Sequence, residues 1–248
     1  MRGLFVTGTG TGVGKTILSA ALLAALAAAG ERVRAHKPVV TGLNEPLAPD
    51  PYASALSPEP SAAWPPDHEL LASIAGMAPE EVAPLRYGPA VSPHLAAQLA
   101  EETIDPEVLA ARAHTAGAGG DTLIVEGVGG LLVPFGEDFT VRDLALALGL
   151  PVLIAAEPGL GTINHTLLTL EAARAGGLDV RAVVLTPWPD TPAGLERSNR
   201  ETIARLGEIE VSGLEHVPSP AAGDLARAGD ALPWRRWLTG GEFIPSDA

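Results

Sequence analysis

The chain has 248 residues and a net charge of −14 at pH 7, with 16 Lys and Arg against 30 Asp and Glu. Nucleic acids and anionic membranes are bound by concentrations of basic side chains, so we expect neither as a partner. The sequence contains no cysteine, which excludes disulfides, thiolate metal sites and cysteine nucleophiles and favours a cytoplasmic location.

Short apolar segments alternate with longer helical segments along the chain. In chain order, the predicted strands are residues 4–7, 33–40, 122–125, 152–156 and 182–185. The predicted helices are residues 17–29, 95–102, 141–148, 163–175 and 196–206. This alternation predicts an α/β fold in which one mostly parallel sheet is flanked by helices on both faces. Ligands bind such sheets at the carboxyl ends of the strands.

The whole chain, residues 1–248, is predicted to form a single P-loop α/β domain. Two stretches break the alternation of strands and helices. Residues 44–66 are rich in Pro, Ala and Ser and are expected to form a loop, and residues 240–248 are expected to form an irregular tail.

The first predicted strand leads into a glycine-rich segment, Gly8 to Thr16, with the sequence Gly-Thr-Gly-Thr-Gly-Val-Gly-Lys-Thr. Its backbone N–H groups would surround the phosphates of ATP, while Lys15 would contact the β and γ phosphates and the Thr16 hydroxyl would hold Mg²⁺. A strict P-loop has four residues between its glycines, whereas five separate Gly8 from Gly14. A strand precedes the segment and a helix follows it, as an ATP site requires. The predicted nucleotide contacts are Thr9, Gly10, Gly12, Val13, Gly14, Lys15 and Thr16.

A second lysine follows the second predicted strand, in the segment His36-Lys37-Pro38. Proline favours an extended conformation in the residue before it. The Lys37 ammonium would then point near the same phosphates, with the Thr41 hydroxyl close by. A lysine after a strand also commonly faces solvent, and its spacing alone does not decide between these alternatives.

Glu126 follows the apolar strand 122–125 and precedes the glycine turn Gly127-Val128-Gly129-Gly130. P-loop proteins commonly place a Mg²⁺ contact here, because the strand that carries it lies beside the P-loop strand. The alternative is a carboxylate that caps a helix or a turn. The glycines would let a substrate approach the backbone closely.

Two further segments are predicted helix starts with exposed N–H groups, Ser92-Pro93-His94 and Gly161-Thr162-Ile163-Asn164-His165. Ser92 is the expected N-cap and Pro93 the expected first helical residue. Such a start would bind an anion. Each segment is also consistent with a helix start that has no ligand.

These five motifs, in this order, resemble dethiobiotin synthetase. They cover residues 8–16, 36–39, 92–94, 125–130 and 161–165, and the resemblance extends from residue 1 to about residue 220. The five-residue interval in the loop is itself a feature of that family. The resemblance implies that 7,8-diaminononanoate, CO₂ and MgATP are converted to dethiobiotin, ADP and phosphate. One amine would form a carbamate, its phosphorylation would give a mixed anhydride, and the second amine would close the ring.

The resemblance also implies roles for individual residues. The expected catalytic residues are Lys15, Lys37 and Thr11. The expected Mg²⁺ ligands are Thr16, Glu126 and Asp67, with Glu69 left open as the alternative to Asp67. The expected substrate contacts are Lys37, Thr41, Ser92, Gly127, Gly129, Gly161, Thr162 and Asn164. In this family the last three reach the substrate across a dimer interface, so a homodimer is implied.

The sequence departs from the family pattern at two places. Gly12 stands where some members carry a glutamate, and residues 185–188, Leu-Thr-Pro-Trp, stand where many carry an Asn-Asp pair that contacts adenine. We therefore expect a loose nucleotide preference, with base contacts from Pro187, Val217 and Pro218. The alternative function is an ATPase switch of the partitioning or metal-delivery type. Those switches carry a lysine where this chain has Gly10.

Overall fold

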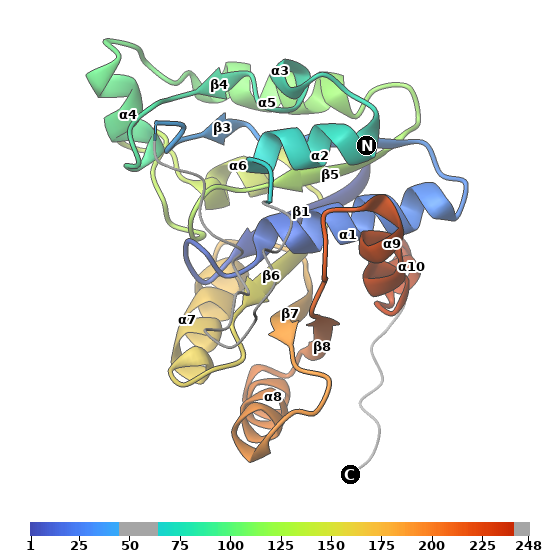
Figure 1. Ribbon diagram of the computed structural model, residues 1–248. Coiled ribbons are helices and arrows are strands. Elements are labelled where there is room, and N and C mark those ends of the chain that lie inside the picture. Colours follow the sequence, from blue (N-terminus) through green and yellow to red (C-terminus); the bar gives the residue numbers. More distant parts are fainter. Residues whose placement is uncertain (45–63, 241–248) are drawn as a thin grey trace.

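The computed structural model describes residues 1–44 and 64–240. A six-stranded parallel sheet lies at the centre, with the spatial order β2-β5-β1-β6-β7-β8 (Figure 1). Its strands, in chain order, are β1 Arg2–Gly8, β2 Val33–His36, β5 Thr122–Glu126, β6 Val152–Ala156, β7 Val180–Trp188 and β8 Glu210–Glu215. The predicted α/β fold, with a mostly parallel sheet, is confirmed.

The register of the central strands brings the ends of β1, β5 and β6 together. Val6 of β1 is the Cα partner of Glu126 of β5, and Gly8 is the partner of Ala155 of β6. Because β1 lies between β5 and β6, the glycine-rich loop after β1 begins directly beside Glu126. The prediction that the strand carrying Glu126 lies beside the P-loop strand is therefore confirmed.

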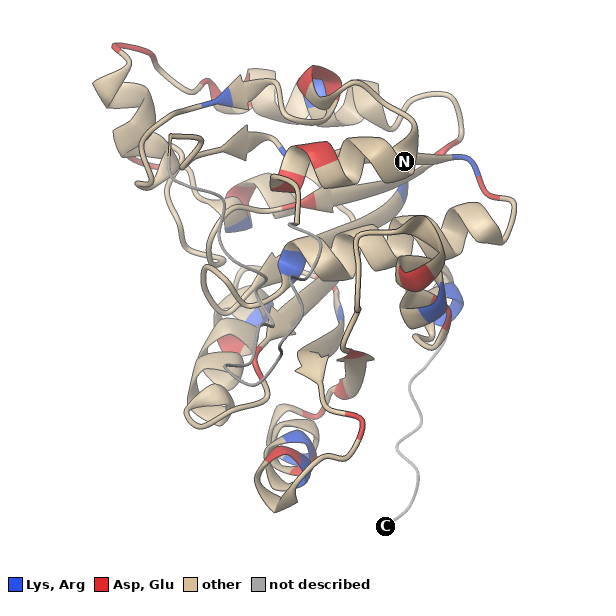
Figure 2. Ribbon diagram, in the orientation of Figure 1, with Lys and Arg blue, Asp and Glu red and all other residues tan. Residues whose placement is uncertain are grey.

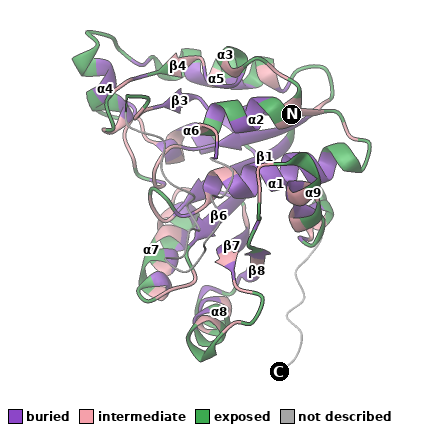
Figure 3. Cartoon of the chain, viewed as in Figure 1, coloured by how far each residue is buried: buried purple, intermediate pink, exposed green. Residues whose placement is uncertain are grey.

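One face of the sheet is covered by helices α1, α2, α9 and α10, with the short helix α3 against α2. These are α1 Lys15–Ala28, α2 Asp67–Ala75, α3 Pro79–Val82, α9 Ala222–Asp230 and α10 Trp234–Thr239. Leu4 and Val6 point to this face and belong to its apolar core. Figure 3 shows α1 almost entirely buried, since α9 covers the side that faces away from the strands. The two helices approach so closely that a Cβ atom on Gly229 would lie 2.1 Å from the Ala21 carbonyl oxygen.

The opposite face packs against five helices. These are α4 Pro93–Leu99, α5 Pro106–Ala116, α6 Val141–Leu148, α7 Thr162–Ala175 and α8 Gly194–Gly207. Phe5 points to this side, alternating with Leu4 and Val6, and the apolar core here is as continuous as that on the other face. Charged residues lie mainly on the outer helices and loops and seldom on the central strands (Figure 2).

The expected single strand at residues 33–40 is wrong. β2 ends at His36, and β3 Val39–Val40 pairs instead with β4 Leu85–Arg86 in a separate two-stranded sheet. Pro38 has no N–H group for a ladder, and the Lys37 N–H donates to the Val82 carbonyl instead. The chain therefore leaves the main sheet at Lys37, which lies at the carboxyl edge.

Several elements were not expected from the sequence. They are α3, β4, α5, β8, α9 and α10. β8 begins with Glu210 and contains Gly213, so it lacks the apolar run of a buried strand. The predicted loop at 44–66 and tail at 240–248 fall almost entirely outside the described residues. Among residues 1–44 and 64–240, no helix has the length and hydropathy needed to cross a bilayer.

His36 ends β2 as a buried histidine. It is 1% exposed, and within the described ranges neither ring nitrogen has a hydrogen-bond partner. Burial, with a smaller contribution from Arg112, lowers the pKa of His36 to about 4. In the unfolded chain its pKa is near 6.5, so between these values the unfolded state binds more protons than the folded state. Stability is therefore full above about pH 6.5 and is lost as the pH falls toward 4.

We expect His36→Phe to reduce the fall in the free energy of unfolding at acid pH. Between pH 7 and pH 4, His36 contributes up to about 3 kcal/mol to the fall in the free energy of unfolding, and the variant lacks that contribution. Urea unfolding at several pH values measures the slope of the free energy of unfolding against pH. A destabilisation by the larger Phe ring that is the same at every pH does not change this slope. His94→Gln, an exposed change, is the control. Equal slopes for wild type and His36→Phe would contradict the prediction.

Candidate nucleotide and substrate site

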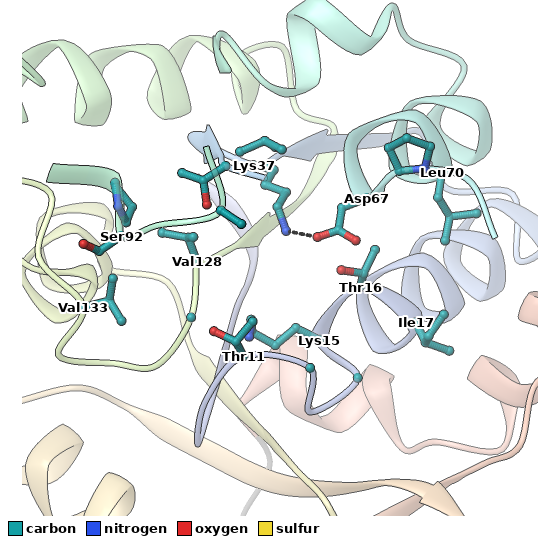
Figure 4. Close-up of a pocket in the computed structure, with 18 of the residues that line it drawn as sticks. Thr11, Lys15, Thr16, Ile17, Lys37, Asp67, Leu70, Ser92, Val128 and Val133 are labelled. Carbon is teal, nitrogen blue, oxygen red and sulfur yellow. Dashed lines mark hydrogen bonds and ion pairs between the residues drawn. The ribbon is translucent and has the colours of Figure 1, made fainter. Parts of the chain in front are cut away.

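A cavity of about 650 Å³ opens at the carboxyl edge of the sheet, between the glycine-rich loop, the start of α1 and the start of α2 (Figure 4). Ten of the residues predicted from the sequence to form the site line it. They are Thr11, Gly12, Gly14, Lys15, Thr16, Lys37, Thr41, Asp67, Ser92 and Gly129. The structure therefore brings together residues from five separate parts of the chain.

The glycine-rich loop enters α1 through Gly14, the N-cap residue, whose φ of 83° is left-handed. A Cβ atom there would lie 2.6 Å from the Thr186 side chain at the end of β7. Only glycine meets both conditions without strain. The free N–H groups of the first turn of α1 therefore face the cavity, as an anion site requires.

Both lysine side chains of the sequence lie in this cavity. The chain has no lysine other than Lys15 and Lys37, and its remaining basic residues are arginines. Both are buried, at 7% and 4% exposure. The Lys15 ammonium donates to the Gly10 carbonyl oxygen at 2.7 Å, so it lies folded over the loop. The solvent-facing alternative for Lys37 is thereby excluded.

Glu126, Thr16, Lys37 and Asp67 form one connected polar group. The Lys37 ammonium donates to Asp67 Oδ2 at 2.6 Å and also to Glu126 Oε1. The Thr16 hydroxyl donates to the same Glu126 oxygen at 2.8 Å. Glu126 is fully buried, whereas the Asp67 side chain is 49% exposed. The group therefore has a buried floor at the end of β5 and an open side at the start of α2.

Burial and neighbouring charge shift the pKa values of these groups in opposite directions. Burial lowers the pKa of Lys15 to about 8, Glu126 partly opposes this shift, and Lys37 adds to it. Burial also acts to lower the pKa of Lys37, but Asp67 and Glu126 outweigh it, so the pKa lies above its usual range. For Asp67, burial acts to raise the pKa, but Lys37 outweighs it and the pKa lies below its usual range. Lys37 and Asp67 therefore form an ionised pair at neutral pH.

The oxygen atoms of this group fit a Mg²⁺ ion. Glu126 Oε2 is buried and has no partner in the described part of the chain, and the Thr16 and Asp67 oxygens lie on the cavity side. Mg²⁺ takes oxygen ligands, commonly one or two carboxylates completed by water and substrate phosphates. In residues 1–44 and 64–240, no three His, Cys, Asp or Glu side chains gather in one place. A cation held here would thus depend on a hydroxyl, water and phosphate besides the two carboxylates.

Asp67 and Glu69, the two alternatives for the third Mg²⁺ ligand, lie differently on α2. Asp67 is the first residue of the helix, lines the cavity and contacts Lys37. Glu69 is exposed and does not line the cavity. Residues two apart on a helix point about 200° apart, so both carboxylates cannot face the same side.

On the other side of the cavity, Ser92 is the N-cap of α4 and Pro93 its first residue, as predicted. The Ser92 hydroxyl makes no capping hydrogen bond and lines the cavity with Thr41 and Gly129. Apolar side chains that the sequence did not single out complete the walls. These include Ile17, Val40, Trp64, Leu70, Val91 and Val133.

The remaining predicted contacts do not line the cavity. Thr9, Gly10 and Val13 belong to the loop itself, and Gly127 lies under Val141 and Phe5. Gly161 caps α7, with Thr162 buried behind it and Asn164 exposed. Pro187 follows Thr186, which contacts Gly14, whereas Val217 is buried and Pro218 exposed on the segment after β8. Within one chain, the cavity therefore lacks the predicted contacts on α7.

Comparison with known proteins gives one consistent family. A family profile described as an AAA domain matches residues 2–220. The ATP-dependent dethiobiotin synthetase BioD of Anaeromyxobacter sp. (strain Fw109-5) is 40% identical over 219 residues, covering 84% of this chain and 91% of that protein. The protein of the same name from Bacillus subtilis (strain 168) is 34% identical, and the match covers 86% of this chain and 87% of that protein. The protein of the same name from Mycobacterium sp. (strain KMS) is 36% identical, and the match covers 97% of this chain and 99% of that protein.

Solved structures with a similar fold are more distant in sequence. The MinC:MinD cell division protein complex of Aquifex aeolicus has a chain with a TM-score of 0.55 and 16% identity, covering 100% of this chain and 99% of that one. The cell division ATPase MinD of Pyrococcus furiosus has a TM-score of 0.52 and 16% identity, and the match covers 92% of this chain and 98% of that one. At this identity the similarity establishes the fold alone.

Proposed function

This chain belongs to the ATP-dependent dethiobiotin synthetase family, and we propose that it carries out that family's reaction in the cavity at the carboxyl edge of the sheet. The enzyme is a ligase that uses ATP to form carbon–nitrogen bonds. Its substrates are 7,8-diaminononanoate and CO₂, and its product is dethiobiotin. The observation that carries the proposal is the meeting of Lys15, Lys37 and the start of α1 in one cavity.

The triphosphate would bind against the loop and the first turn of α1. The backbone N–H groups there donate to phosphate oxygens, and Lys15 moves from the Gly10 carbonyl to the β and γ phosphates. Thr11 lies in the loop opposite Ser92 and would orient the reacting groups between them. Because the cavity has buried walls, these charges act with less screening than in water.

Lys37 would act on the substrate carbamate and the phosphoryl group that it receives. An anionic carbamate that attacks an anionic phosphate needs positioning and charge neutralisation rather than a protein nucleophile. Thr41, Ser92 and the amides after Glu126 would hold the carbamate near Lys37. Thr16, Asp67 and Glu126 would hold Mg²⁺, which supplies further positive charge at the transferring phosphate.

The nucleotide base would lie near the end of β7, next to Pro187, with Val217 and Pro218 along its border. The contact between Thr186 and Gly14 supports this, because it brings the end of β7 against the P-loop. Since these side chains offer no amide or carboxylate for the adenine edge, we propose a loose nucleotide preference.

We further propose a single-domain chain that forms a cytoplasmic homodimer, in which Gly161, Thr162 and Asn164 reach the substrate bound by the partner subunit. Two exposed leucines support this arrangement, Leu160 just before α7 at 94% and Leu168 in the middle of α7 at 57% exposure. Asn164 is also exposed, so it is free to contact a second chain.

The function is tested by incubating the protein with 7,8-diaminononanoate, bicarbonate and MgATP. We expect phosphate release that requires the diamine, together with a product of the mass of dethiobiotin. Omitting the diamine is the control. Phosphate release that does not depend on the diamine, with no such product, would favour the ATPase switch instead.

A further inference from the structure

The position proposed for the metal is occupied by a positive charge of the protein itself. The Lys37 ammonium lies between the two carboxylates, 2.6 Å from Asp67 Oδ2 and in contact with Glu126 Oε1. Its side chain is 5% exposed, so little water competes for these contacts. Figure 4 shows Lys37 pointing to Asp67, with Thr16 nearby. One oxygen of each proposed carboxylate ligand, Asp67 Oδ2 and Glu126 Oε1, is thus already engaged by Lys37.

The Lys37 ammonium and a divalent cation would compete for the same carboxylate oxygens. The two carboxylates with Lys37 carry one net negative charge, and Glu126 Oε1 also accepts from the Thr16 hydroxyl. A divalent cation added beside the ammonium would meet like charge at close range, which disfavours its binding. A metal ion therefore binds well only after Lys37 has left these oxygens.

A bound nucleotide offers Lys37 an alternative partner. The phosphates would lie in the same cavity, between Lys15 and Lys37. Lysine has a flexible four-carbon stem, so its ammonium can move between partners without a change in the backbone. Phosphate oxygens would also supply the metal ligands that the two carboxylates lack.

We propose that Lys37 is the resident counter-ion of the metal site and that a divalent cation binds only when nucleotide phosphates draw the ammonium away from Asp67 and Glu126. This rests on the metal role proposed above for these residues. Metal and nucleotide then bind cooperatively, and by linkage each strengthens the binding of the other. Lys37 is the group that couples them, in addition to its role toward the substrate.

The test is binding of Mn²⁺ to the nucleotide-free protein, measured from the free Mn²⁺ signal by electron paramagnetic resonance. We expect weak binding to wild type and a Kd lower by about tenfold or more for Lys37→Met, which frees both carboxylates and keeps an unbranched side chain one atom shorter than lysine. Lys15→Met is the matched control. It removes an ammonium from the same cavity, but one that contacts a carbonyl rather than a carboxylate, so its Kd should change far less.

Three results would overturn the proposal. The first is that nucleotide-free wild type binds Mn²⁺ as tightly as Lys37→Met does. The second is that Lys15→Met increases the Mn²⁺ affinity as much as Lys37→Met does. The third is that the increase in Mn²⁺ affinity persists in the double variant Lys37→Met/Glu126→Gln. Near-ultraviolet circular dichroism checks the fold of each variant, and Lys37→Gln replaces Lys37→Met if the latter is unfolded. With a non-hydrolysable ATP analogue, wild type should bind Mn²⁺ tightly and the difference should shrink. Dethiobiotin formation by wild type is measured separately and tests the proposed function, whatever the outcome of the Mn²⁺ binding experiment.

Discussion

Lys15→Ala is expected to lower kcat/KM for MgATP by about a thousandfold or more, because it removes a preorganised charge from the phosphates. The ammonium lies over the glycine-rich loop at the Gly10 carbonyl and lines the cavity. Its loss leaves the β and γ phosphates without this ammonium, although the backbone N–H groups of α1 can still bind them. Steady-state release of phosphate in the presence of the diamine measures the effect.

The fold should survive this change. Burial lowers the pKa of Lys15, which means that its charge is held in the folded protein at a cost. We therefore expect the free energy of unfolding to be unchanged or higher in the variant. Arg227→Ala, which removes a cation with a 75% exposed side chain on α9, is the control and should retain full activity. A Lys15→Ala rate within about tenfold of wild type would refute the assigned role.

Lys37→Ala is expected to lower kcat by a similar factor of about a thousand, because its charge acts on the carbamate and the phosphoryl group during transfer. The effect on stability should differ from that of Lys15→Ala. The change leaves the fully buried Glu126 without its ammonium partner, and removing one partner of a buried ion pair costs about 3–5 kcal/mol. The exposure of Asp67 and the remaining Thr16 hydrogen bond place the expected cost at the low end of that range.

Single-turnover kinetics and urea unfolding together test this prediction. Rates are to be measured on protein whose near-ultraviolet circular dichroism matches that of wild type, so that unfolding is not counted as lost chemistry. Lys37→Arg keeps the charge and provides the comparison for stability. A Lys37→Ala protein that turns over normally, or that is as stable as Lys15→Ala, would contradict the placement of this ammonium on Glu126.

Local patterns were sufficient to predict the P-loop and Glu126. The glycine-rich segment follows an apolar strand and precedes a helix, and each of these features is visible within a few residues. Glu126 was predicted from the same logic, because parallel strands that end with polar residues meet at one edge. Both predictions depended on patterns within a few residues, and in the structure Glu126 contacts Thr16 at the end of the P-loop.

Lys37 and Asp67 could be placed only in part. The apolar run through Val40 suggested one continuous strand, and only the lost ladder bond at Pro38 and the alternative acceptor at Val82 turn the chain out of the sheet. That acceptor lies 45 residues later in the sequence, so no local pattern could reveal it. Asp67 and Glu69 were indistinguishable because the start of α2 follows a stretch with no periodicity. β8 was missed because neighbouring β7, rather than its own apolar content, determines that it is a strand.

The confinement of both lysines to the cavity has a consequence for the outer surface. Dissolved CO₂ adds reversibly to neutral primary amines, whereas guanidinium groups remain protonated and do not react in this way. Since every basic side chain outside the cavity is an arginine or a histidine, the exterior offers no ε-amino group to compete with the diamine for this gas. Amine-acylating reagents would likewise modify lysine side chains only inside the cavity, so the labelling of lysine, measured separately from that of the α-amino group, would report on whether the cavity is filled.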